Sequence, residues 1–175
     1  MRALVVYESM FGNTKQVAVA IAKGLAARVP VEVVEVAHAP ETLGDDVDLV
    51  VVGGPTHAFG LSSPRTRRTA AARSTGPLVS QGKGVREWVS CLHLHRDHTV
   101  VATFDTHVDT KWFPGSAAKR LDGTLHAMGM RRLAAPSSFY VRDSAGPLVD
   151  GEIERAEMLG RWLGEELVSR QPSNA

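Results

Sequence analysis

Two stretches of the chain are almost continuously apolar and predict strands buried on both faces. They cover residues 47–54, VDLVVVGG, and residues 98–105, HTVVATFD. Strands that helices cover on both faces lose the usual alternation of polar and apolar positions. We therefore expect both stretches to be central strands of a parallel sheet, together with the apolar run of residues 3–7 as the first strand.

Two other stretches predict strands at the edges of that sheet. Residues 31–36, VEVVEV, carry Glu32 and Glu35, which suit a strand that is partly in contact with water. A last strand is expected within residues 131–142. Pro136 must lie at an edge, at a bulge or outside that strand, because proline cannot donate a hydrogen bond to a neighbouring strand.

Helical periodicity fills the gaps between these strands. In residues 14–28 apolar side chains recur on one helical face. Ser63 followed by Pro64 is typical of a helix start, with a capping residue before a proline in the first turn. Helices are predicted at residues 14–28, 64–73, 85–92, 115–129 and 150–168.

The alternation of strands and helices predicts the fold class. It indicates an α/β domain of three layers, with a doubly wound, five-stranded parallel sheet and right-handed crossovers. A chain of 175 residues has the length of one domain. We assign residues 1–170 to this domain and expect residues 171–175 to be a frayed C-terminal tail.

Composition indicates a cytoplasmic protein. Apolar residues make up 43% and charged residues 22% of the chain, as in ordinary globular proteins. No apolar stretch approaches the ~18 to 20 residues of a membrane span, and no secretory signal pattern is present at the N-terminus. The single cysteine, Cys91, fits a reducing compartment, and we expect it to be a small buried side chain.

The loops at the carboxyl ends of the strands are the expected ligand sites, because sheets of this class bind ligands there. Neither GxxxxGK[ST] nor GxGxxG follows the first strand, which excludes the common triphosphate and dinucleotide sites. A receiver domain would need an aspartate at the end of the third strand, where this chain has Gly53 and Gly54. A low-molecular-weight phosphatase would need a cysteine in the first loop. The loops to consider are residues 8–14, 54–62 and 104–115.

Residues 8–14 predict a site for one phosphate group. Ser9 and Thr14 offer hydroxyl groups, Asn13 offers an amide, and Gly12 offers a flexible backbone. The N-terminus of the following helix adds free N–H groups and roughly half a positive charge. A monophosphate can therefore bind without any lysine or arginine inside the turn.

Residues 9–14, Ser-Met-Phe-Gly-Asn-Thr, resemble the phosphate-binding loop of the flavodoxin family, [ST]-x-[TS]-G-N-T. They depart from that pattern at Phe11, where the family has a hydroxyl residue. Residues 54–60, Gly-Pro-Thr-His-Ala-Phe-Gly, are similar to the Pro-Thr-Arg-Phe-Gly stretch of flavodoxin-like NAD(P)H:quinone reductases. The resemblance implies a flavodoxin-like fold with strand order 2-1-3-4-5.

The resemblance also implies a non-covalently bound FMN. Its phosphate would lie in residues 8–14, and its ring would lie between residues 54–60 and 104–113. Phe59 and either Trp112 or Phe113 are available to stack on the ring. The implied cofactor-binding residues are Ser9, Met10, Phe11, Gly12, Asn13, Thr14, Pro55, Thr56, His57, Ala58, Phe59, Gly60, Phe104, Asp105 and Thr106.

Three of these residues, Phe104, Asp105 and Thr106, are selected by topology alone. Asp105 either accepts a hydrogen bond from the flavin or caps a turn. In the second loop, a protonated His57 would add positive charge near the ring.

Arg65, Arg67, Arg68 and Arg73 follow the second loop, in a chain whose formal net charge is +1. Electron-carrier flavodoxins are typically acidic, so either the partner of this chain is acidic or the chain is not a carrier of that kind. The arginines could also attract an anionic substrate or NAD(P)H, or form a solvated helix face. Nucleic acid is not expected, since no aromatic residues alternate with the arginines.

Three functions stay open from the sequence. The chain is an FMN-binding redox protein that passes electrons to a partner protein, an FMN enzyme that takes hydride from NAD(P)H and reduces a quinone-like acceptor, or a cofactor-free binding or regulatory protein. No catalytic residue can be assigned, and no membrane partner is expected. No metal site is expected either, since no fourth ligand accompanies His93, His95 and His98 at a recognisable spacing.

Overall fold

The computed structural model describes residues 1–57, 60–74, 76–94, 98–109 and 115–170. The strands are β1 (Arg2–Tyr7), β2 (Val31–Glu35), β3 (Val47–Pro55), β4 (Val100–Val108), β5 (Arg131–Arg132) and β6 (Ser137–Val141). The helices are α1 (Asn13–Leu25), the 3-10 turn η1 (Val36–His38), α2 (Pro64–Ala72), α3 (Val85–Ser90), α4 (Ala117–Ala127) and α5 (Glu152–Ser169). The predicted C-terminal tail, residues 171–175, lies outside the described residues.

The strands form one parallel sheet with the order β2-β1-β3-β4-β5, and β6 also pairs with β4. β5 pairs with the start of β4, at Val100 and Val101, and β6 pairs with the rest of β4 from Phe104 onward. The two short strands therefore share the fifth position of the sheet. Pro136 lies between them and belongs to neither, which agrees with its missing N–H donor. The predicted fold class and strand order are confirmed.

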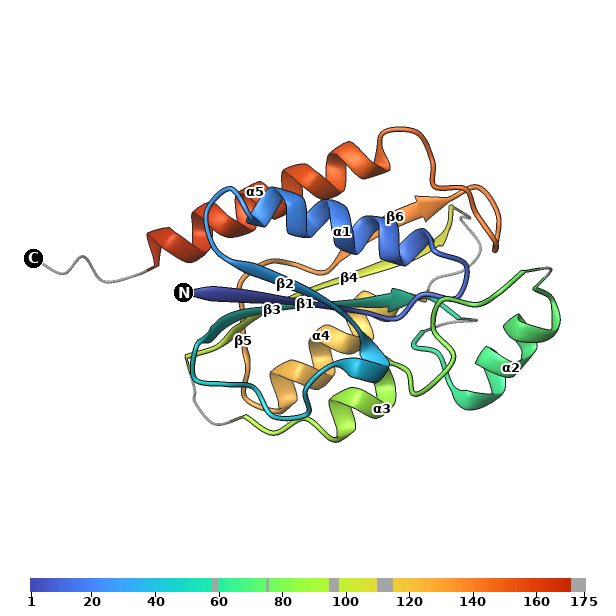
Figure 1. Cartoon of the computed structure of the whole chain (residues 1–175), viewed down its shortest axis with the longest axis horizontal. Helices are drawn as coiled ribbons and strands as arrows, with labels where there is room; N and C mark the ends of the chain where they lie inside the picture. The colour runs from blue at the N-terminus through green and yellow to red at the C-terminus, as the bar shows by residue number, and fades with distance from the viewer. Residues whose placement is uncertain (58–59, 75, 95–97, 110–114, 171–175) are drawn as a thin grey trace, which may run out of the picture.

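Helices cover both faces of the sheet (Figure 1). α1 and α5 pack on one face, against strand residues such as Val5 and Val51. α3 and α4 pack on the other face, against Val6 and Val52. The central strands β3 and β4 are buried over most of their length, whereas the edge strand β2 is partly exposed, as Glu32 and Glu35 predicted. No helix of the described residues is long and apolar enough to span a membrane.

Cys91 is exposed, so the expectation of a buried cysteine was wrong. It follows the last residue of α3, whose buried face carries Val85, Trp88 and Val89. At 100° per residue Cys91 lies well away from that face, which the short helix turns toward the sheet. Composition alone, from which burial was expected, contains no information about this angle.

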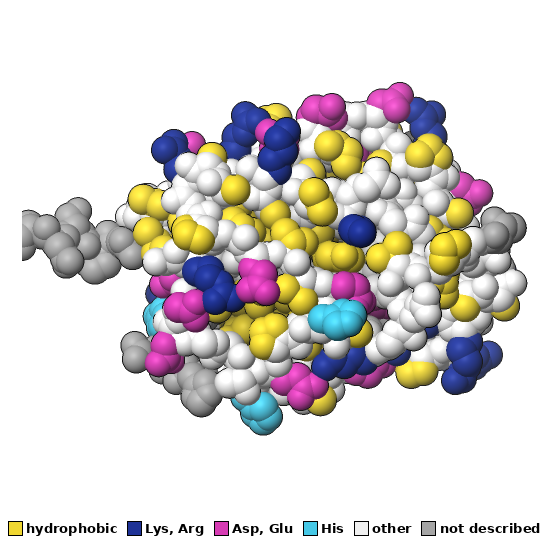
Figure 2. All heavy atoms as spheres, viewed as in Figure 1, with side chains coloured by type: hydrophobic (Ala, Val, Ile, Leu, Met, Phe, Trp, Pro, Cys, Tyr) yellow, Lys and Arg dark blue, Asp and Glu magenta, His cyan; other side chains and the backbone are white. Residues whose placement is uncertain are grey.

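The carboxyl ends of the strands lie at one edge of the sheet. Tyr7 pairs with Gly53, and Gly54 pairs with Asp105. α2 stands beside this edge without any buried residue, and the view in Figure 1 shows it projecting from the two layers of helices. In Figure 2 Lys and Arg side chains lie over the lower right of the molecule, where Figure 1 places α2. Ser63 caps this helix before Pro64, as the sequence predicted.

Candidate functional site

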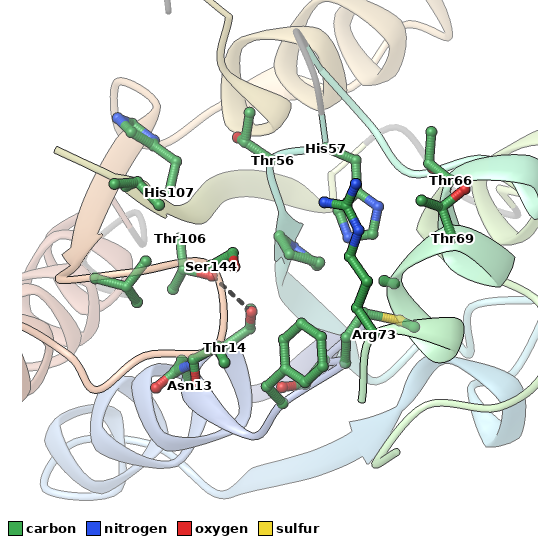
Figure 3. Close-up of a pocket in the computed structure, with 18 of the residues that line it drawn as sticks. Asn13, Thr14, Thr56, His57, Thr66, Thr69, Arg73, Thr106, His107 and Ser144 are labelled. Atoms are coloured by element: carbon green, nitrogen blue, oxygen red, sulfur yellow. Dashed lines mark hydrogen bonds between the residues drawn. The ribbon is translucent and has the colours of Figure 1, made fainter. Parts of the chain in front are cut away.

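A cavity of about 420 Å³ opens at the carboxyl edge of the sheet (Figure 3). Six parts of the chain line it: the turn after β1, the end of β3 with His57, the inner side of α2, the end of β4, the end of β6, and the loop after β6. Its volume is within the range of ~300 to 1,000 Å³ that is common for small-molecule sites. The cavity therefore occupies the place where a doubly wound sheet is expected to bind its ligand.

The floor of the cavity is the turn between β1 and α1. Gly12 is the N-cap of α1 and has φ of 91°, a left-handed conformation that glycine adopts at little cost. The Ser9 hydroxyl oxygen accepts hydrogen bonds from the amides of Gly12, at 3.1 Å, and Lys15, at 3.2 Å. The N-cap residue Gly12 has no side chain to cap α1. The amides of Asn13 and Thr14, which have no partner within the helix, are therefore available to a ligand.

Hydrogen bonds to other segments hold this turn in place. The carbonyl groups of Ser9 and Met10 accept from the amides of Ser80, at 2.8 Å, and Val79, at 3.1 Å. The Asn13 side chain donates to the Ala145 carbonyl at 3.1 Å. Thr14 shares a hydrogen bond of 2.8 Å with Thr106 at the end of β4. The turn is thus fixed from outside while its helix-end amides stay free.

The second loop is joined to β4 through Thr56. Its amide donates to the Thr106 carbonyl at 2.9 Å, and its hydroxyl donates to Asp105 at 3.0 Å. The next residue, His57, lies against the cavity. Burial lowers the pKa of His57, and the positive charge of Arg67 lowers it further. The neutral imidazole is therefore favoured, so the protonation that would let His57 add positive charge near the ring is disfavoured.

The three residues that topology selected from β4 have different environments. Phe104 is fully buried in the core, where its ring meets Phe139 edge to face with centroids 6.4 Å apart. Asp105 is also fully buried and accepts from the Ser116 hydroxyl at 2.7 Å and the Ala118 amide at 2.9 Å. It therefore caps the start of α4, which is the second of its two expected roles. Only Thr106 reaches the cavity.

Burial acts to raise the pKa of Asp105, but the hydrogen bonds that it accepts outweigh this effect. His107 contributes most, followed by Ser116 and the Ala118 amide, and the pKa of Asp105 is held below its usual value. The aspartate is thus a charged, fully bonded group beneath the cavity.

The sequence-predicted residues are distributed as follows. Those that line the cavity are Ser9, Met10, Phe11, Asn13, Thr14, Pro55, Thr56, His57 and Thr106. Gly12, Gly60, Phe104 and Asp105 do not line it. Ala58, Phe59, Trp112 and Phe113 lie outside the described residues.

Sequence reasoning missed three groups of lining residues, the third of which belongs to α2. β4 continues to Val108, three residues beyond its predicted end, so that His107 and Val108 reach the cavity. Ser144 and Ala145 follow the fifth strand position, whose carboxyl end opens at the same edge. The rule that ligands bind at the carboxyl ends of parallel strands could have found the second group, had it been applied to the last strand.

Helix α2 makes one wall of the cavity and gives it a positive charge. Arg65, Thr66, Thr69 and Ala70 face the cavity, and Arg73 reaches into it from the end of the helix (Figure 3). No aspartate or glutamate is among the described lining residues. The cavity therefore favours an anionic ligand.

The histidines considered for a metal give no such centre in the described part of the chain. His95 lies outside it, and no group of three His, Cys, Asp or Glu side chains among the described residues could hold a metal ion. His98 lies 3.9 Å from Asp48, on the side of the sheet where β3 begins.

Comparisons with known proteins agree with this geometry. Residues 5–77 match the sequence profile of the family described as Flavodoxin. A flavodoxin from the domain Archaea is 19% identical, with a TM-score of 0.63, and the alignment covers 96% of this chain and 99% of that one. The flavodoxin of Streptococcus pneumoniae TIGR4 is 18% identical, with a TM-score of 0.64 and coverage of 98% and 100%.

A WrbA-like flavodoxin from Agrobacterium tumefaciens is 17% identical, with a TM-score of 0.59 and coverage of 97% and 99%. No curated protein matches the sequence significantly. At identities below 20%, the structural likeness shows the fold alone. The family match covers the first three strands and the turn between β1 and α1. The chain thus has the flavodoxin-like fold, and its residues 5–77 are similar to the Flavodoxin family.

Proposed function

We propose that the chain is an FMN-binding redox protein that transfers electrons through a non-covalent flavin. The observation that carries the proposal is the open N-terminus of α1 at the floor of the cavity. Gly12 leaves the helix without a side-chain cap, and the cavity extends from there to α2. Such a helix end binds a phosphate group through its amides and its dipole.

The residues present fit this cofactor. The amides of Asn13 and Thr14 and the hydroxyl of Ser9 are donors for one phosphate, and no carboxylate in the described lining would repel it. Phe11 replaces a hydroxyl residue of the family pattern, but its side chain also lines the cavity and gives it an apolar surface. When bound, FMN supplies the capacity to accept and donate electrons.

The protein's own part is to position the cofactor and to limit water. The Thr14–Thr106 and Thr56–Thr106 bonds join the three loops that surround the cavity. Val108 and Val141 add apolar surface on the side of β4 and β6. Because these contacts exist before any ligand binds, little ordering is needed on binding, which favours affinity.

The proposal is tested by the visible spectrum of the purified protein, as isolated and after removal of bound ligand and addition of FMN. We expect the absorption bands of a bound flavin and quenching of free FMN fluorescence at a ratio of one FMN per chain. A protein that is colourless and leaves the fluorescence of added FMN unchanged at micromolar concentrations would contradict the proposal. That result would favour a cofactor-free protein.

A second function, reduction of a quinone-like acceptor by NAD(P)H, is favoured by the arginines on the cavity wall. Arg65 and Arg73 could attract an anionic dinucleotide to the cavity. The FMN-loaded protein, supplied with NADH or NADPH and a soluble quinone, separates the two functions. Catalytic oxidation of the nucleotide supports the enzyme, and absence of turnover with a flavin that is still reducible by dithionite supports the carrier.

A further inference from the structure

The charges of this chain are segregated along the sequence. Residues 49–86 contain six of the 20 Lys and Arg residues and none of the 19 Asp and Glu residues. The rest of the chain therefore has 14 basic and 19 acidic residues, a net charge of −5, against +6 for this segment. The overall charge of +1 conceals this difference.

The structure gathers most of this charge at α2. Arg67 pairs with Glu87 at 3.0 Å, and Lys83 pairs with Glu41 at 2.6 Å, so both are neutralised. Arg65, Arg68 and Arg73 are exposed, and no carboxylate of the described residues pairs with them. These three guanidinium groups, which we call the α2 arginines, leave the helix strongly positive.

Helix α2 is also open to a partner. None of its residues is buried, and Ala71 and Ala72 are small exposed residues between the arginines. The helix contributes no buried residue to the two apolar layers, and its Arg67 side chain donates to the Ser62 hydroxyl, just before the helix, at 2.8 Å. Its outer surface is therefore free for contact.

The position of α2 connects this surface with the cavity. Thr66 and Thr69 line the cavity from the inner side of the helix, while Arg68 points to the opposite side, toward a second hollow that it shares with Arg67 and Gln81. A protein seated on the outer side of α2 would therefore lie within one helix diameter, ~10 Å, of a cofactor in the cavity.

We propose that α2, with Arg68 on its outer side and Arg65 and Arg73 beside the cavity, forms the docking surface for an electron-transfer protein with an acidic face. The redox character of this partner rests on the proposed function, whereas the acidic face rests on the charge of α2 alone. Complementary charge speeds encounter and orients the partner, and redox complexes commonly use small interfaces that a short helix can supply.

Binding is tested on the ¹⁵N-labelled protein with a defined acidic probe, oxidised plant-type ferredoxin, at low ionic strength. We expect amide shifts concentrated in residues 64–73, and binding that weakens as salt is added. Basic cytochrome c serves as the opposite probe and should leave these amides unchanged. Shifts with ferredoxin that lie on α5, or none at all, would overturn the proposal.

Two charge reversals make the test specific. Arg68→Glu changes an exposed residue that does not line the cavity, and Arg131→Glu makes the same change in β5, which pairs with the start of β4, at the opposite edge of the sheet. We expect at least a tenfold weaker affinity for ferredoxin with Arg68→Glu and less than a threefold change with Arg131→Glu. Equal effects of the two variants would show that only total charge matters and would overturn the proposal.

NADPH is the third probe, because an anionic dinucleotide could use the same charge. If NADPH shifts the amides of α2 and ferredoxin does not, the docking proposal is wrong. Since this experiment needs no flavin, its result is independent of FMN uptake. A protein that binds ferredoxin through α2 but takes up no FMN would contradict the proposed function while supporting the docking surface.

Discussion

Glu8, the residue before the phosphate-type turn, is fully buried. One carboxyl oxygen accepts from the Val85 amide at 2.9 Å, and the other has no partner among the described residues. Burial raises the pKa of Glu8, and hydrogen bonds from Ser62 and the Val85 amide, with the charge of Arg67, offset only part of this effect. The folded protein therefore holds a proton on Glu8 more tightly than the unfolded chain does.

Replacement of Glu8 by glutamine is expected to change the pH dependence of stability. A carboxyl with a raised pKa in the folded state stabilises the protein at low pH, and this stability is lost as the pH rises from the unfolded pKa, near 4.5, through the folded pKa. Glu8→Gln removes this loss. In urea unfolding from pH 4 to pH 8, the variant should lose less stability with rising pH than the natural protein.

The control for Glu8 is Glu154→Gln, which changes an exposed glutamate in α5. It should keep the pH profile of the natural protein. A Glu8→Gln variant whose profile also matches the natural one would show that the burial of Glu8 is not coupled to its protonation.

Asp105→Asn is expected to destabilise the start of α4. The carboxylate accepts bonds from Thr56, Ser116 and the Ala118 amide, and hydrogen bonds to a charged group contribute about 1.5 to 3 kcal/mol each. An asparagine can still accept some of these hydrogen bonds. We therefore expect the free energy of unfolding to fall by about 2 kcal/mol, measured by urea unfolding at pH 7. Because the folded protein lowers the pKa of Asp105, its carboxylate stabilises the protein fully at pH values above the unfolded pKa, near 3.8. This stabilisation is lost as the pH falls through the folded pKa.

Asp150→Asn, which changes an exposed aspartate paired with Arg142, is the control and should alter stability little. Equal stability of the two variants would mean that the Asp105 network is not needed for the fold.

The sequence predicted the site residues that act within one turn and the helix start next to it. Gly12, Ser9 and Thr14 act through the turn and the helix that they begin, so their spacing reveals them. Asp105 could not be assigned in the same way, because its partner Ser116 is 11 residues away and beyond a loop. Arg73 was missed as a lining residue because nothing in its neighbourhood shows which side of α2 faces the cavity.

Among the elements, α1 and α5 have the closest contact, and glycine makes it possible. A Cβ atom added to Gly160 would lie 2.0 Å from the Ile21 carbonyl oxygen of α1, and one added to Gly24 would lie 2.1 Å from the Glu157 carbonyl oxygen of α5. Both are backbone atoms, which cannot move without shifting a helix. The two helices therefore pack backbone to backbone across this face of the sheet.

Gly160→Ala is expected to destabilise the protein although alanine is the better helix former. The clash forces the helices apart and should cost about 1 to 3 kcal/mol of unfolding free energy, as overpacking does. Gly123→Ala in α4 is the matched control, since an added Cβ there has nothing within 4 Å. That change should stabilise the protein by roughly 0.5 to 1 kcal/mol. Thermal unfolding that gives both variants the same sign would contradict the close packing of α1 and α5.

Most elements follow directly from apolar periodicity and capping residues. The exceptions have physical causes. The fifth strand position is divided at Pro136 into β5 and β6. Helix α2 forms with the help of its Ser63 cap, although none of its residues is buried in either apolar layer. Its local sequence specifies the helix but contains no large apolar residue that would specify where the helix packs.

For the whole molecule, one edge of the sheet combines the open helix end, the cavity and the positive helix. All Asp and Glu residues of the chain lie outside residues 49–86, the segment that carries α2. Shape and charge thus agree on a single functional edge, where an anionic cofactor and an acidic partner would meet.

The central claim is that the N-terminus of α1 holds the phosphate of a bound flavin. It is tested most directly by calorimetric titration of the ligand-free protein with FMN and, in parallel, with riboflavin, which has the same ring and no phosphate. We expect one FMN per chain and at least tenfold weaker binding of riboflavin, a difference of about 1.4 kcal/mol or more. Equal affinities for the two flavins, or no binding of FMN, would contradict the account.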